Sequence, residues 1–185
     1  MPAPLLLIEP IVADPDAANL EGGVRLAVER PQDVAAIMAL VERAFGPGRY
    51  AKVSERVREG NRLLPELSFC AFGAGALVGT VRQWPIEVGD APGVFLGPIA
   101  VESAWRKHGV GGLLVQRCCE AAMAAGAGFI LLVGDLSFFG AYGFEQVPPG
   151  RIRLPGPVNP RRVLWRPLYA GAVDAVAGDV QAPRR

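Results

Sequence analysis

The sequence predicts an α+β fold in which a central mixed, mostly antiparallel sheet is flanked by helices, with the strands splayed at Gly97-Pro98. Short alternating segments separated by turn residues indicate antiparallel hairpins in the first half of the chain. A strand-helix-strand pattern from Val94 to Val133 indicates one parallel pair joined by a right-handed crossover. A proline inside the first of those strands indicates local separation, because proline cannot donate to a ladder.

The length of 185 residues, 51% of them hydrophobic, fits one buried core. Several prolines and the Glu21-Gly22-Gly23 break predict that residues 1–23 form an N-terminal extension, followed by a single domain over residues 24–185. The apolar stretch Leu5 to Ile8 lacks a basic flank and is interrupted by Pro10, so it predicts neither a signal peptide nor a membrane span. A cytoplasmic protein without a membrane partner is therefore expected.

Charge and cysteine content exclude two further classes. The formal net charge of +1 provides no field that would attract nucleic acid. Cys118 and Cys119 are adjacent and Cys70 lies in an apolar run, which matches neither a disulfide framework nor a metal-ligand spacing. We expect reduced, buried thiols and no metal.

The first half of the chain alternates strands and helices. Val24 to Val28 alternates like a short strand, and Pro31 can open the helix that follows it. Gly46-Pro47-Gly48 ends that helix, and a second helix is predicted from Tyr50 to Arg58, before Gly60-Asn61. The predicted inward face of the first helix consists of Val34, Ile37, Met38, Val41 and Phe45.

A hairpin and a strand-helix-strand unit follow. Leu67 to Phe72 and Ala76 to Trp84 predict two strands around Gly73-Ala74-Gly75. Val94 to Val101 predicts a third strand, and a helix is expected from Gly111 or Gly112 to about Ala125. The continuous apolar run from Phe129 to Val133 predicts a strand buried on both faces. The inward stripe of the helix is predicted to be Leu114, Cys118, Ala121 and Ala125.

The segment between the third strand and that helix is suited to bind phosphate. It reads Arg106-Lys107-His108-Gly109-Val110-Gly111-Gly112. Small residues leave consecutive N–H groups free at the positive end of the helix, and the basic residues add charge, which together predict a pyrophosphate site. A P-loop is excluded because no Gly-Lys-Ser/Thr is present. A dinucleotide fingerprint remains an alternative, since Asp135 has the expected spacing although Leu114 occupies the third glycine position.

Pro98 indicates what else lies beside that loop. A central strand that carries proline is bulged or unpaired, which leaves backbone groups free to pair with an extended, amide-bearing ligand. A pantetheine arm that ends in a pyrophosphate has both of the required features. An edge strand with an incidental bulge is the alternative.

The residues from Leu96 to Val101 and from Trp105 to Gly111 closely resemble the acyl-CoA-binding motif of the GNAT superfamily of N-acetyltransferases. Leu131 to Asp135 and Phe138 to Phe144 resemble the later strand, short helix and aromatic-Gly-Phe ending of that superfamily. The tail, Arg151 to Pro157 and Trp165 to Gly171, is similar to a bacterial branch of predicted N-acetyltransferases. The resemblance covers roughly Val24 to Gly178.

The resemblance implies an acyl-CoA N-acyltransferase domain and assigns its cofactor residues. The co-substrate would be acetyl-CoA or another acyl-CoA, and the acceptor a small-molecule or peptide amine; a homodimer is compatible with this class. The backbones of Ile99, Ala100 and Val101 would meet the pantetheine arm, and Phe139 would border the thioester. The pyrophosphate would be held, mostly through main-chain N–H groups, by Arg106, Lys107, His108, Gly109, Val110, Gly111 and Gly112.

One position departs from the family pattern. Many members place a tyrosine four residues before the glycine of the last motif, where it is thought to protonate the departing thiolate; Phe139 stands there in this chain. Tyr142 is next to Gly143, where packing is the expected role and acid catalysis the alternative. Two hypotheses follow: an enzyme that transfers an acyl group directly to a primary amine, and an acyl-CoA-binding sensor or interaction module without turnover.

The catalytic residues are not assigned by the sequence. The carboxylates that flank strands are Glu66, Glu87, Asp90, Glu102 and Asp135, and each is also interpretable as a solvated surface group or, for Asp135, a helix cap. His108 lies in the phosphate loop, which favours a phosphate contact or exposure over base catalysis. The segment from Phe45 to Pro65 and the Trp84 to Gly93 loop are expected to shape the acceptor pocket, with no charge cluster to identify the ligand.

Overall fold

The computed structural model describes residues 23–183, so the predicted extension over residues 1–23 lies outside the described residues except for Gly23. The strands are β1 (Val24–Val28), β2 (Phe69–Gly73), β3 (Ala76–Val88), β4 (Ala91–Val101), β5 (Phe129–Val133), β6 (Glu145–Gln146), β7 (Ile152–Arg153), β8 (Val163–Pro167) and β9 (Gly178–Gln181). The α-helices are α1 (Val34–Phe45), α2 (Val53–Arg58), α3 (Val110–Ala124) and α4 (Leu136–Phe139).

The strands form one mixed sheet whose principal path runs β1-β2-β3-β4-β5-β8-β6. Along this path every pair is antiparallel except β4 and β5, which are joined by the crossover through α3. Off the path, β9 pairs with both β3 and β7. The β7–β9 pair is parallel and was not predicted. The predicted α+β class, with a mixed, mostly antiparallel sheet and a parallel β4–β5 pair, is confirmed.

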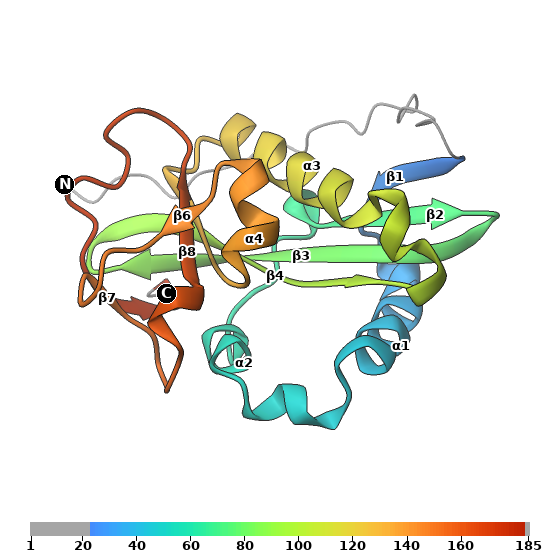
Figure 1. Ribbon diagram of the computed structural model, residues 1–185, viewed down its shortest axis with the longest axis horizontal. Helices are drawn as coiled ribbons and strands as arrows, with labels where there is room; N and C mark the ends of the chain where they lie inside the picture. The colour runs from blue at the N-terminus through green and yellow to red at the C-terminus, as the bar shows by residue number, and fades with distance from the viewer. Residues whose placement is uncertain (1–22, 184–185) are drawn as a thin grey trace.

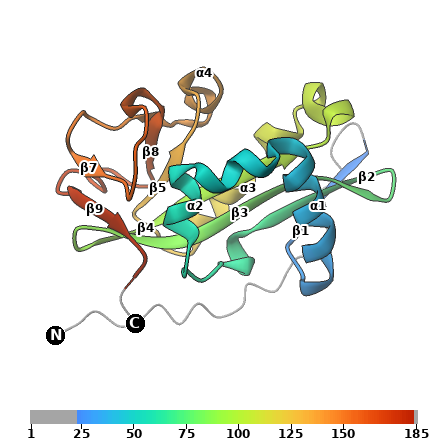
Figure 2. The same ribbon diagram turned by 90° about the horizontal axis from the view of Figure 1, so that it is seen from below.

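Helices cover the two faces of the sheet (Figures 1 and 2). The helix α3 packs on one face, where Leu114 and Cys118 are fully buried against residues of β2, β3 and β5. The helices α1 and α2 lie on the opposite face (Figure 2). Strand alternation supplies both layers: Ile130 and Leu132 join the α3 core, whereas Phe129 and Leu131 join a core on the other face. The buried run predicted from Phe129 to Val133 thus lies between two apolar layers.

The inward face predicted for α1 is partly wrong. Ile37 and Val41 are buried as expected, and Leu40 completes the buried stripe. Val34, Met38 and Phe45 are exposed by 40%, 38% and 39%, because the helix contacts the sheet over a narrow stripe. Phe45, at the carboxyl end, instead reaches a cavity described below.

The second helix is shorter than predicted. A 3₁₀ segment over Pro47–Ala51 precedes α2, which starts only at Val53. The predicted hairpin is confirmed, although β3 extends past Trp84 to Val88. The four strands after α4 were not predicted, because each is short and pairs with strands or segments distant in sequence.

A carboxylate clamp fixes the 3₁₀ segment Pro31–Asp33 that leads directly into α1. Asp33 accepts hydrogen bonds from the backbone N–H of Arg30 at 3.0 Å and from its guanidinium at 3.0 and 3.1 Å. The side-chain hydrogen bond from Arg30 is the main cause that lowers the pKa of the nearly buried Asp33. Since α1 carries Val41 and Phe45 to the cavity below, this clamp helps to place the cavity wall.

We expect Asp33→Asn to lower the melting temperature near neutral pH by roughly 2–4 °C, the usual effect of losing one helix cap in a domain of this size. Because the pKa of Asp33 is lowered in the folded state, its contribution exists above the pKa of the unfolded chain and disappears as the pH falls below about 4. Thermal melts of both proteins between pH 7 and pH 3.5 test this expectation. A difference that stays constant over that range would contradict it.

Among the described residues, no helix combines the length and the apolar character that crossing a membrane requires.

Candidate functional site

Two adjoining cavities lie along the carboxyl half of β4. The larger cavity, about 580 Å³, is lined by residues of α1, α2, β4, β5 and α4. The smaller cavity, about 450 Å³, is lined by the end of β4, the start of α3 and Tyr142. Phe45, Ile99 and Phe138 line both, so the two cavities adjoin, and we refer to them together as the trench.

The trench exists because β4 and β5 separate. They pair only through Val94 with Ile130 and Phe95 with Leu131. On its other side β4 stays paired with β3, where Gly97 and Pro98 form a bulge opposite Arg82 between the Ile99 and Leu96 pairs. The Gly97-Pro98 peptide is cis, and Gly97 has φ 126°. The predicted splay at Gly97-Pro98 is therefore confirmed, and the alternative of an edge strand is wrong because β4 is central.

The phosphate-loop segment forms a 3₁₀ helix, Ser103–His108, that leads into α3. Gly109 joins the two helices in the left-handed conformation, with φ 74° and ψ 1°, a conformation that glycine adopts without a steric penalty. Gly111 and Gly112 follow in the first turn of α3, where backbone N–H groups lack partners within the helix. The positive end of α3 therefore faces the smaller cavity.

The structure brings most of the predicted cofactor residues to this trench. The smaller cavity is lined by Ile99, Ala100, Val101, Arg106, Gly109, Gly111 and Gly112, and the larger one by Ile99 and Phe139. Lys107, His108 and Val110 line neither. Lys107 and His108 are exposed on the 3₁₀ helix, whereas the side chain of Val110 is completely buried. Val110 can reach a ligand only through its main chain.

Two glycines allow aromatic rings to approach the trench walls. A Cβ on Gly112 would lie 1.9 Å from the hydroxyl of Tyr142, which packs against the start of α3. A Cβ on Gly134 would lie 2.3 Å from the ring of Phe139. Phe139 in turn makes edge contacts with Phe138 and Phe144. Tyr142 therefore lies beside the helix start, on the smaller cavity, and Phe139 beside the splay, on the larger one.

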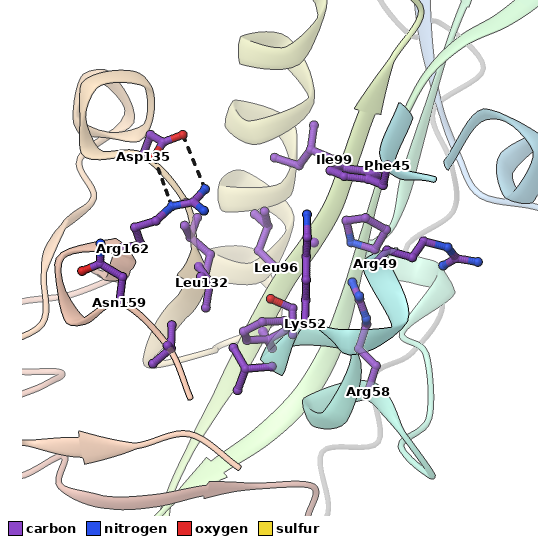
Figure 3. A pocket seen from close by; sticks show the side chains of 18 of the residues that line it. Phe45, Arg49, Lys52, Arg58, Leu96, Ile99, Leu132, Asp135, Asn159 and Arg162 are labelled. Atoms are coloured by element: carbon purple, nitrogen blue, oxygen red, sulfur yellow. Dashed lines mark hydrogen bonds and ion pairs between the residues drawn. The ribbon is translucent and has the colours of Figure 1, made fainter. Parts of the chain in front are cut away.

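Basic side chains line the larger cavity, a feature that the sequence analysis missed. The titratable residues of the lining are Arg49, Lys52, Arg58, Arg162 and Asp135. Figure 3 shows Lys52 and Arg58 extending toward the interior, whereas the guanidinium of Arg49 points away from it. Three of the basic residues, Arg49, Lys52 and Arg58, come from the segment expected to shape the acceptor pocket, where the sequence indicated no charge cluster. Only the structure shows that they line one cavity together with Arg162.

Of the two segments expected to shape an acceptor pocket, one lines the larger cavity. Phe45, Ala51 and Val53 of the predicted Phe45 to Pro65 segment line the larger cavity. The Trp84 to Gly93 segment does not line it: it belongs to the β3–β4 hairpin, with its turn at Gly89 and Asp90, and its end pairs with β9. The segment lies away from the larger cavity because β3 extends four residues farther than predicted, to Val88.

Of the carboxylates considered as bases, only Asp135 lines a cavity among the residues that the structure describes. It follows β5 and pairs with Arg162, whose Nε lies 3.1 Å from Oδ1 (Figure 3). Asp135 occupies the N-cap position of α4, as the capping interpretation expected, but its side chain makes no capping hydrogen bond. Glu102 pairs with Arg43. Glu66, Glu87 and Asp90 lie away from both cavities.

The cysteines are buried, as predicted. Burial raises the pKa of Cys70 to about 12 and holds the pKa of Cys118 well above its usual value. Burial likewise raises the pKa of Cys119. None of the three lines the trench, so the thiols have neither the access nor the ionisation that a nucleophile needs.

A mixed sheet splayed at a central strand, with a glycine-rich helix start beside the splay, defines the class of acyl-CoA-type N-acyltransferase folds. Residues 34–144 match the acetyltransferase (GNAT) family. The match covers more than half of the chain, and the chain belongs to this family. The predicted superfamily, fold class and enzyme class are confirmed.

Relatives support the same assignment over most of the chain. The uncharacterized N-acetyltransferase YhbS of Escherichia coli K12 is 27% identical over 158 residues, which cover 84% of this chain and 94% of YhbS. The crystal structure of E. coli YhbS in complex with CoA has a TM-score of 0.76 and 26% identity, and covers 90% of this chain and 93% of that one. A GNAT family acetyltransferase from Brucella melitensis, in complex with acetyl-CoA, has a TM-score of 0.58 and 28% identity over 83% of this chain and 100% of that one.

Proposed function

We propose that this protein transfers an acyl group, in the first instance acetyl, from acyl-CoA to a primary amine by direct attack. The observation that carries the proposal is that the two cavities share Phe45, Ile99 and Phe138 in their walls. One end is the positive start of α3, the middle is the splay at Gly97-Pro98, and the other end is a separate chamber lined by α2. A donor and an acceptor can therefore meet at Ile99 and Phe138, which line both cavities.

The donor fits the smaller cavity. Free N–H groups of Val110, Gly111 and Gly112 would hold the pyrophosphate, and the unpaired edge of β4 from Ile99 to Val101 would pair with the pantetheine amides. The thioester would then lie near Phe139. YhbS and the Brucella protein were solved with CoA and with acetyl-CoA respectively, which supports acyl-CoA as the co-substrate here.

In the proposed reaction, the amine nitrogen attacks the thioester carbonyl carbon, a C–N bond forms, and the C–S bond breaks. The departing sulfur takes up a proton and leaves as the CoA thiol, while the amine loses a proton to solvent or a base. A backbone N–H near Ile99 would polarise the carbonyl. The buried, protonated cysteines favour this direct route over a covalent intermediate.

Proton loss from the amine is the step that most needs assistance. An alkyl ammonium with a pKa of about 10.4 is deprotonated to roughly one part in 10³–10⁴ at pH 7. Asp135, the one carboxylate among the described residues of the larger cavity, is already paired with Arg162, so solvent is the proposed acceptor of this proton.

Phe139 favours a second candidate function, an acyl-CoA-binding module without turnover. A phenylalanine cannot protonate the thiolate, and a general acid typically contributes about 10²–10⁴-fold. The CoA thiolate, however, leaves readily, since an alkyl thiol titrates near 8.5. We therefore keep the enzyme as the leading function.

Thiol release separates the two functions. Acetyl-CoA is incubated with the protein and a panel of primary amines, and free CoA thiol is followed with a chromogenic thiol reagent, while CoA binding is measured independently by thermal shift. Stabilisation by about 2.7 kcal/mol is expected at a CoA concentration 100 times the dissociation constant. Binding with amine-dependent thiol release supports the enzyme; binding with no release on any amine supports the module; no binding overturns both.

A further inference from the structure

We propose that the acceptor amine also carries a carboxylate, which Lys52 and Arg58 bind in the larger cavity. This inference rests on the proposed acyl transfer and narrows its acceptor to one chemical class. The side chains that support it line the larger cavity, on the side that faces away from the start of α3. Membership of the family does not by itself assign a role to any of them.

Lys52 supplies the main argument. Its side chain lines the cavity, and in the described part of the chain it forms no ion pair and no side-chain hydrogen bond. Its ammonium lies 5.3 Å from the centre of the Phe45 ring, and the side chain extends into the cavity (Figure 3). The ring holds the ammonium in position but does not neutralise it, so the charge remains available to an anionic ligand.

Arg58 gives a second, buried cation on the same wall. Its guanidinium donates to Glu55 at 2.6 Å and lies 5.3 Å from the centre of the Trp84 ring, with the side chain only 11% exposed. One carboxylate contact leaves further N–H donors, because a guanidinium has five. Burial is the main cause that lowers the pKa of Arg58, which shows that this charge is poorly solvated. An arriving carboxylate would replace the missing water.

The balance of charge across the chamber points the same way. Among the described lining residues, four side chains are basic and Asp135 is the only acid. Carboxylates pair with Arg49, Arg58 and Arg162, which leaves Lys52 as the lining cation without a carboxylate partner in the described part of the chain. The Asp135–Arg162 pair lies on the wall formed by β5 and the segment before β8, opposite Lys52 and Arg58 (Figure 3). An acceptor with a carboxylate at one end and an amine at the other could direct its carboxylate to α2 and its amine to the splay.

Matched pairs of acceptors test the inference. β-Alanine is compared with its carboxamide, and γ-aminobutyrate with its carboxamide, each with acetyl-CoA. A charge-assisted contact predicts that kcat/KM for the carboxylates is about 10-fold or more higher. Lys52→Met should remove most of that preference through KM, Lys52→Arg should retain it, and CoA affinity should stay unchanged. Arg62→Met, which removes an exposed charge outside both cavities, serves as the control.

The outcomes keep this inference separate from the proposed function. Equal turnover of carboxylates and carboxamides, or a preference that Lys52→Met leaves intact, overturns the carboxylate site while acyl transfer stands. If no amine is turned over, thermal shift of the CoA-bound protein with each acceptor still decides: selective stabilisation by the carboxylates, lost in Lys52→Met, supports the site. No selective stabilisation overturns it.

Discussion

Replacing Gly111 with glutamate is expected to lower the affinity for CoA by about 100-fold or more, which corresponds to roughly 2.7 kcal/mol. Gly111 lies in the first turn of α3 and lines the smaller cavity. A Cβ there would lie 3.5 Å from Phe138 and 3.8 Å from Val101, so a side chain fits without displacing the backbone. A carboxylate would then occupy the anion site and repel the pyrophosphate.

The matched control is Gln116→Glu, which adds the same charge to an exposed position farther along α3. Isothermal titration with CoA should give near wild-type affinity for the control and severe loss for Gly111→Glu, with similar melting temperatures for both free proteins. Equal CoA affinity in the two variants would mean that the start of α3 does not hold the pyrophosphate.

The second large effect concerns the closed part of the β4–β5 pair. Gly93 on β4 faces Phe129, and a Cβ on Gly93 would lie 2.5, 2.7 and 2.8 Å from three atoms of its ring. Phe129 is 1% exposed and cannot move away. We expect Gly93→Val to destabilise the protein by about 3 kcal/mol, the upper part of the usual overpacking range, and to lower the melting temperature by roughly 6–12 °C.

Urea unfolding and thermal melts measure this effect. Gly48→Val is the control, because a Cβ on Gly48 meets nothing within 4 Å and its φ is not positive. Adding Phe129→Leu to Gly93→Val should recover part of the lost stability, because leucine is smaller than phenylalanine and leaves room for the new valine side chain. If Gly93→Val and Gly48→Val unfold alike, the close packing of Gly93 against Phe129 is not present in solution.

Local sequence patterns were sufficient for the elements that we propose to bind the donor. Pro98 breaks strand pairing wherever it lies, because it lacks an N–H, and the glycines before α3 favour a tight turn whatever packs on them. The splay and the helix start could therefore be predicted. The inward face of α1 could not be predicted correctly, because several positions satisfy a helical period and only contact with the sheet selects Ile37, Leu40 and Val41.

The C-terminal strands show the same limit. β8 pairs with β5 and β6, and β9 pairs with β3 and β7. Each is at most five residues long, so little periodicity is available within the segment itself. Each of these segments becomes a strand by pairing with another strand, and the local sequence does not indicate which strand that is.

By itself, the sequence determined the family, the splayed strand and the glycine-rich helix start, because glycine and proline act on the backbone locally. Only the tertiary structure decided the character of the acceptor chamber. Lys52 and Arg58 come from one region of the chain, whereas Arg162 and Asp135 come from two others. Charged residues that are distant in sequence come together only when the chain folds. The spacing of residues along the sequence therefore does not predict the distances between their side chains.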